Sequence, residues 1–113
     1  MSARNALLQA PPFHVEEALT QLGANLRVAR VRRRLTIQDV ATKIGTGPRA
    51  VMDAEKGKPS TSVAVYVALL WAYDLLAPLS ALAHPNTDEQ GLALLSHLER
   101  TRVRPTRGLS GDF

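Results

Sequence analysis

Basic side chains in the middle of the chain are the residues whose type and clustering best fit a defined chemistry, the binding of phosphate groups. Residues 27–58 hold nine basic and three acidic side chains, a net charge of +6, while the other residues hold five basic and seven acidic ones and sum to −2. Such clustering is the electrostatic footprint of a phosphate-binding surface. A solvated helix face would carry the same charge, so the pattern leaves both interpretations open.

Residues for catalysis or metal binding are sparse. His14, His84 and His97 stand apart in the sequence, without metal-ligand spacing and without a neighbouring nucleophile. The chain has no cysteine and no glycine-rich phosphate loop. We therefore expect no enzyme activity, no metal and no cofactor.

Composition also bounds the location of the protein. The lack of cysteine fits a reducing cytoplasm, and no apolar run reaches the roughly 18–20 residues of a membrane span. The N-terminus carries an arginine and Pro11-Pro12 without the apolar run of a secretion signal. A cytoplasmic protein that does not associate with membranes is expected.

The elements that position the basic residues are predicted to be helices. The chain of 113 residues is long enough for one domain with a short appendage. Ala, Leu, Arg and Glu dominate, and an alternating Val/Ile/Tyr run is missing, which predicts an all-α fold. Residues 1–14, interrupted by Pro11-Pro12, are expected to form a flexible arm.

Apolar spacing and capping residues set the bounds of the predicted helices. Val15, Ala18, Leu19, Leu22, Leu26 and Ala29 make one apolar face. Thr36 and Asp39 resemble a capping box, and Gly45 ends the helix that follows. We predict helices over residues 15–35, 37–44, 48–56, 62–73 and 79–83, a last helix after a capping box at 87–90, and disorder after Arg100.

Two short helices joined by the glycine-containing turn Gly45-Thr46-Gly47 form a helix-turn-helix arrangement. Three motifs make a resemblance specific: Leu22-Gly23-x-x-Leu26-Arg27-x-x-Arg30, Leu35-Thr36-x-x-Asp39-Val40-Ala41-x-x-Ile44-Gly45 and Val51-x-x-x-Glu55-x-Gly57-x-Pro59-Ser60. Over roughly residues 20–83 the chain resembles the Cro/lambda-repressor-type (XRE) family of five-helix DNA-binding domains. This implies a DNA-binding domain over 15–84 and an extension over 85–113 with a short helix and a flexible tail.

The resemblance implies that the third helix, Pro48 to Lys56, enters the major groove. By position, four of its side chains face bases or nearby phosphates: Pro48, Arg49, Met52 and Asp53. Arg49 is the best candidate, since a guanidinium can bond a guanine edge through two hydrogen bonds. Side chains placed for phosphates are Gln38, Lys43, Lys56, Lys58, Arg32, Arg33 and Arg34.

Several positions depart from the family pattern or have a structural role in it. Ile37 stands where the family often has a phosphate-contacting Gln, Pro48 brings no hydrogen-bond donor, and Asp53 would suit only cytosine N4. Base contacts are therefore expected to be sparse, and affinity to depend on phosphate contacts. Family positions Arg30 and Glu55 imply a partly buried ion pair. Trp71 and Tyr73 are expected to be core or interface side chains.

Three functions remain open: a stand-alone repressor, the antitoxin of a HipA-like Ser/Thr kinase toxin–antitoxin operon (HipB type), and a protein–protein adaptor that has lost DNA binding. Asp88 to Leu94, Arg102 to Pro105 and Asp112-Phe113 are similar to the tails of regulators that accompany such kinases, which favours the antitoxin. Leu109, Asp112 and Phe113 would then enter a pocket of the kinase, unless the tail has no function.

A homodimer on a palindromic operator is expected, because most helix-turn-helix regulators bind two-fold sites. The apolar residues that exceed the needs of the core are predicted to form its interface: Leu75, Leu76, Leu79 and Leu82, with Leu92 and Leu95 as further candidates. The same leucines could equally pack within one monomer.

Overall fold

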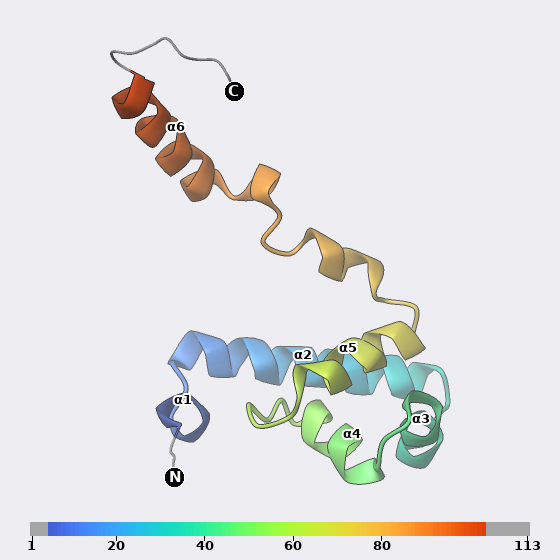
Figure 1. The fold of residues 1–113 in the computed structure, drawn as a ribbon. Coiled ribbons are helices and arrows are strands. Elements are labelled where there is room, and N and C mark those ends of the chain that lie inside the picture. Colours follow the sequence, from blue (N-terminus) through green and yellow to red (C-terminus); the bar gives the residue numbers. More distant parts are fainter. Residues whose placement is uncertain (1–4, 104–113) are drawn as a thin grey trace. The chain divides into compact units, whose positions relative to one another are not determined.

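The structure of the protein is a computed structural model that describes residues 5–103, and these residues form helices and connecting turns without a strand (Figure 1). The helices are α1 (Ala6–Gln9), α2 (Phe13–Arg32), α3 (Ile37–Ile44), α4 (Pro48–Glu55), α5 (Val63–Ala72), the 3-10 helices η1 (Ala77–Ala81) and η2 (Pro85–Thr87), and α6 (Glu89–Val103). The predicted all-α class is confirmed. None of these helices is long and apolar enough to span a membrane.

The chain divides into two compact units, Met1–Ala77 and Pro78–Phe113. The sequence predicts the division after residue 84, where His84 and Pro85 break the helical pattern. The contacts of the helical bundle end earlier, at the start of η1.

Local capping sets both ends of α3, and a proline begins α4. Thr36 Oγ1 accepts a hydrogen bond from the Asp39 N–H, and Asp39 Oδ2 accepts one from the Thr36 N–H, both at 2.9 Å. Gly45 ends α3 in the left-handed conformation at φ 82°, and Pro48 occupies the first turn of α4. The predicted capping box and the three-residue turn are therefore confirmed.

The first long helix differs from its prediction at both ends. α2 begins at Phe13, directly after Pro12, and ends at Arg32 rather than at Leu35. Arg34 takes a left-handed φ of 56°, and the Leu35 N–H bonds back to the Arg30 carbonyl, which closes the turn. Within the predicted flexible arm, residues Ala6–Gln9 form a one-turn helix capped by the Asn5 side chain.

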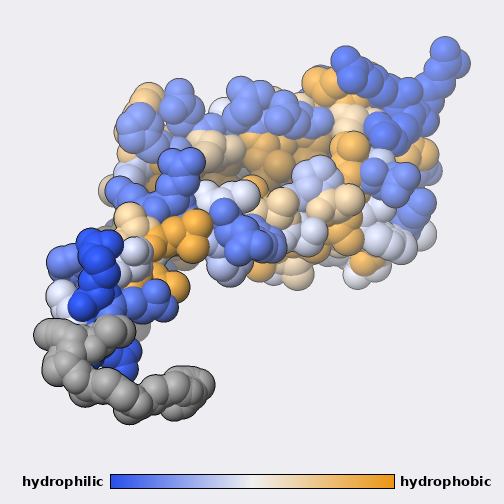
Figure 2. All heavy atoms as spheres, turned by 90° about the horizontal axis from the view of Figure 1, so that it is seen from above, coloured by the Kyte–Doolittle hydropathy of each residue, from blue (hydrophilic) through white to orange (hydrophobic). Residues whose placement is uncertain are grey.

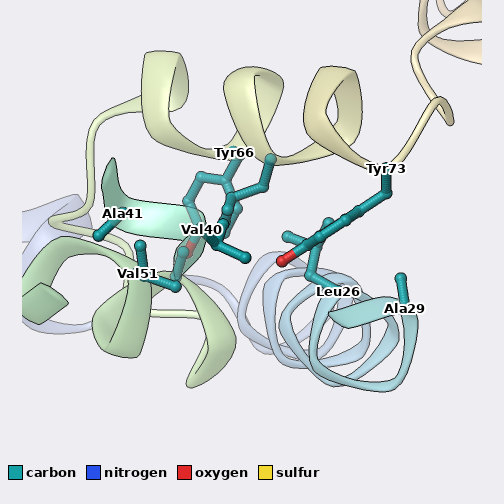
Figure 3. Packing of buried hydrophobic residues seen from close by; sticks show 9 residues of the cluster. Leu26, Ala29, Val40, Ala41, Val51, Tyr66 and Tyr73 are labelled. Atoms are coloured by element: carbon teal, nitrogen blue, oxygen red, sulfur yellow. The ribbon is translucent and has the colours of Figure 1, made fainter. Parts of the chain in front are cut away.

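The core lies among α2, α3, α4 and α5 and is shown in Figure 3. Its buried residues are Leu26, Ala29, Val40, Ala41, Val51, Ala54, Tyr66, Leu69 and Tyr73. Leu19 packs at its edge, whereas Val15 and Ala18 are exposed, so the predicted inward face of α2 is wrong over its first turns. The buried face of the helix starts about one turn later.

The second unit also departs from the sequence prediction. The predicted fifth α-helix is the 3-10 helix η1. Asp88 rather than Thr87 caps α6, because Asp88 Oδ1 accepts from the Gly91 N–H at 3.0 Å while Thr87 Oγ1 donates to the His84 carbonyl. α6 continues to Val103, past the point where disorder was expected.

Candidate nucleic-acid interface

Two glycines allow the backbones of α2 and α4 to approach closely. A Cβ on Gly23 would lie 2.5 Å from the Ala54 carbonyl oxygen and 2.7 Å from the Gly57 nitrogen. Gly57 has a φ of +72°, and a Cβ there would contact the Leu19 carbonyl oxygen. The C-terminal end of α4 is therefore fixed directly against α2.

An ion pair fixes the same end of α4 through side chains. Arg30 Nε donates to Glu55 Oε2 at 2.6 Å, and Arg30 Nη2 donates to Glu55 Oε1 at 3.1 Å. Arg30 Nη1 also donates to the Leu35 carbonyl at 2.9 Å. The two side chains are only 12% and 7% exposed, and the hydrogen bond to Glu55 raises the pKa of Arg30. The structure thus contains the pair that the family resemblance implies.

The opposite side of α4 faces outward. Val51 and Ala54 are buried, whereas Pro48, Arg49 and Lys56 are exposed. The Arg49 side chain is 78% exposed, and Met52 and Asp53 are partly buried beside it. Helical spacing of three and four residues puts Arg49, Met52 and Lys56 on one outer stripe. A helix that is fixed on its inner side and exposes such a stripe on its outer side can enter a DNA groove.

Asp53 lies between two basic side chains of this region. Its Oδ1 atom is 3.6 Å from Arg49 Nε and 3.4 Å from Lys58 Nζ. The sequence predicts that Asp53 could accept a hydrogen bond from cytosine. In the structure its carboxylate forms ion pairs with Arg49 and Lys58.

A hollow of about 320 Å³ adjoins the outer stripe of α4. Its lining residues come from α2, the start of α3 and α4: Arg27, Arg30, Ile37, Met52, Glu55 and Lys56. Since Arg30 and Glu55 neutralise each other, Arg27 and Lys56 give the hollow a net positive charge. Ile37 makes its wall apolar. Arg27 was not among the predicted site residues, although its position three residues before Arg30 indicates the same face of α2.

Two predicted phosphate contacts have other partners. Arg33 donates to the carbonyls of Ala29 and Tyr73, each at 2.9 Å, and its guanidinium lies 5.5 Å from the centre of the Tyr73 ring. It connects the end of α2 to the end of α5. These tertiary contacts were not predicted from the sequence, and the phosphate contact of Arg33 stays a prediction.

Lys43 also lies away from the start of α3. Its ammonium is 5.8 Å from the centre of the Trp71 ring on α5. Five residues separate it from Gln38, which at about 100° per residue turns the two side chains about 140° apart on α3. Lys43 is therefore not grouped with Gln38. Trp71 itself is 55% exposed and is not a core residue, whereas Tyr73 is buried as expected.

The remaining predicted site residues are distributed as follows. Gln38 is exposed at the start of α3 and donates to Thr42 Oγ1 at 3.2 Å. Arg32 and Arg34 are exposed at the end of α2. Leu75 and Leu82 are exposed, and Leu76 and Leu79 are partly buried. Leu109, Asp112 and Phe113 lie outside the described residues.

Comparison with known proteins adds one match. A family model described as "Helix-turn-helix domain" matches residues 21–83, more than half of the chain. The match includes the Arg30–Glu55 pair and all of α3 and α4. Searches of curated proteins and of solved structures find no significant match.

Proposed function

The chain belongs to the helix-turn-helix domain family, and on that premise we propose that it is a transcriptional repressor that binds double-stranded DNA with α4 in the major groove. One observation carries the proposal. The inner side of α4 is fixed by the Arg30–Glu55 pair, while Arg49 on its outer side is 78% exposed. A rigidly held helix with an exposed guanidinium suits direct reading of a guanine, for which Arg49 would give up its 3.6 Å contact with Asp53.

The other contacts follow from the same placement. Arg27 and Lys56, at the edge of the hollow, and Gln38, at the start of α3, take neighbouring phosphates. Met52 offers an apolar contact to a thymine methyl group. Because base contacts are expected to be sparse and Arg49 is the main one, most of the affinity comes from phosphates and falls steeply with salt.

Selection from random duplex DNA with the full chain tests this function. We expect enrichment of an inverted repeat whose half-sites lie about 34–36 Å apart, as for other two-fold regulators. Binding that ignores sequence at every salt concentration would reduce the function to non-specific DNA binding. If the chain binds none of the duplex DNA, our proposal is wrong and the protein–protein adaptor function remains.

The finer proposal is that this repressor is the antitoxin of a HipA-like kinase and represses the operon they share. Its support is the similarity of Asp88 to Leu94 and Arg102 to Pro105 to regulators that accompany such kinases. We propose no catalytic activity, no cofactor and a cytoplasmic location for the protein itself.

A pull-down from native extract tests the partner. The full chain should retain a kinase, and a chain lacking residues 104–113, which keeps all of α6, should lose it while still binding the selected DNA. Retention of the kinase by the shortened chain contradicts the role of the tail. If neither chain retains a kinase, the antitoxin proposal is wrong and a stand-alone regulator remains.

A further inference from the structure

Four leucines of α6 are exposed in the unit that begins at Pro78. Their exposed fractions are 45% for Leu92, 65% for Leu94, 51% for Leu95 and 54% for Leu98. The segment next to the grey residues exposes hydrophobic and hydrophilic surface together (Figure 2). Contact of α6 with η2 leaves these leucines open. Helices of about 12–15 residues are marginal alone in water, so an apolar partner surface would stabilise this one.

The spacing of these residues is symmetric. At about 100° per residue, Leu92, Leu95 and Leu98 fall within an arc of about 120° on α6, and Arg102 falls within the same arc. Leu92 and Leu98 are each three residues from Leu95. The cap residue Asp88 and the basic residue Arg102 are each seven residues from Leu95. The face therefore has an apolar centre, an acidic start and a basic end.

We propose that α6 pairs with α6 of a second copy of this chain, antiparallel and two-fold about Leu95. In this arrangement Leu95 meets Leu95, Leu92 meets Leu98, and Asp88 meets Arg102 at both ends. The interface is the same patch on both copies, as two-fold symmetry requires. Antiparallel helix dipoles add a further favourable term.

The charges at the two ends of α6 favour a second copy of α6 as its partner, and favour the antiparallel over the parallel direction. In a parallel pair, Asp88 would face Asp88, Glu99 would face Glu99 and Arg102 would face Arg102, three like-charge contacts. In the antiparallel pair Glu99 faces Gly91, which has no side chain. The sequence of α6 is thus complementary to its own reverse direction.

This inference deepens the proposed function, and its biological role rests on that function. A two-fold pair would supply the two DNA-binding units that an inverted repeat needs. It also moves the main interface from Leu75, Leu76, Leu79 and Leu82 to α6. Its test contains no DNA, so a failure of pairing and a failure of DNA binding are separate results.

Sedimentation of the full chain over a concentration series measures the pairing. The wild type should move from 12.3 kDa towards twice that mass with rising concentration. Leu95→Glu, which places two carboxylates on the axis, should remain a monomer. Ala93→Glu is the matched control, since residue 93 lies on the opposite side of α6, and it should dimerise like the wild type.

A charge exchange tests the direction. Arg102→Glu should weaken the dimer at least tenfold, because it places glutamate opposite Asp88. Adding Asp88→Arg in the same chain should restore the dimer, although Asp88 also caps α6. A wild type that stays monomeric, equal effects of Leu95→Glu and Ala93→Glu, or a double variant no tighter than Arg102→Glu would each overturn the antiparallel pair. If the wild type is monomeric and Leu95→Glu still melts at a lower temperature than Ala93→Glu, the chain's own residues cover α6 and the pair is wrong.

Discussion

Arg30 and Glu55, twenty-five residues apart, join α2 to the C-terminal end of α4 through two hydrogen bonds of 2.6 and 3.1 Å. α4 has only eight residues and buries only Val51 and Ala54, so packing alone positions it weakly. The ion pair adds a second attachment to α2. It fixes the rotation of the helix about its own axis. The side chains on the outer stripe are thereby aimed before any DNA is bound, which lowers the entropic cost of binding.

The pair should be a major source of stability. Arg30→Ala leaves the Glu55 carboxylate largely buried without its partner, and breaking a buried pair in this way costs about 3–5 kcal/mol. Arg33→Ala, which loses hydrogen bonds at a more exposed position, should cost about 1 kcal/mol. Arg32→Ala is the exposed control and should leave the melting temperature unchanged. Equal losses of stability for Arg30→Ala and Arg33→Ala would show that the Arg30–Glu55 pair is not a major source of stability.

Gly57 should tolerate no side chain. Gly57→Ala combines a left-handed φ, worth about 1–2 kcal/mol, with a contact against the Leu19 backbone that only a shift of α2 can relieve. We expect the variant to be mostly unfolded in chemical denaturation. Gly47→Ser is the control: the site is open, and a serine at this N-cap should stabilise α4 by a few tenths of a kcal/mol. A wild-type midpoint for Gly57→Ala would contradict the close approach.

Acid should weaken the start of α3. Hydrogen bonds from the backbone and side chain of Thr36 hold the pKa of Asp39 below its ordinary 3.8. Because the folded pKa is the lower one, this stabilisation is present above about pH 4 and is lost as the pH falls through the folded value. Asp39→Asn should therefore show a shallower fall of melting temperature in acid than the wild type. Glu16→Gln, at an exposed position of α2, is the control and should show the wild-type dependence of melting temperature on pH. If Asp39→Asn loses melting temperature in acid as steeply as the wild type, the capping contribution is contradicted.

Alkali should act through a buried tyrosine. Burial raises the pKa of Tyr73 to about 12 from an ordinary 10.0, because the core disfavours the phenolate. The folded pKa is the higher one, so the stabilisation is complete below about pH 10 and is lost as the pH rises towards 12. Among the described residues the buried Tyr73 hydroxyl has no hydrogen-bond partner. Tyr73→Phe should thus be at least as stable at pH 7 and should unfold at higher pH; earlier alkaline unfolding would refute this.

Sequence reasoning reached the local features and missed those that depend on tertiary contacts. The Thr36–Asp39 capping box, Gly45 and Pro48 act within a few residues, so their patterns predicted α3 and α4 with nearly the observed bounds. The Arg30–Glu55 pair was available only through the family resemblance. The contacts of Arg33 and Lys43 depend on Tyr73, directly after α5, and on Trp71 within it, and no spacing along the chain indicates those contacts. The exposure of Trp71 was missed because α5 is apolar on all sides.

The central claim, that α4 reads DNA through Arg49, is tested most directly by the affinity of Arg49→Ala for the site selected by the wild type. Loss of a guanine contact should weaken binding by about 1–3 kcal/mol, roughly five- to 150-fold. Arg49→Lys, which keeps the charge but not the paired hydrogen bonds, should lose sequence preference and retain non-specific binding. Arg100→Ala on α6 removes the same charge elsewhere and should bind like the wild type. If Arg49→Ala and Arg100→Ala bind the site equally well at matched salt, α4 does not read DNA through this residue and the account is wrong.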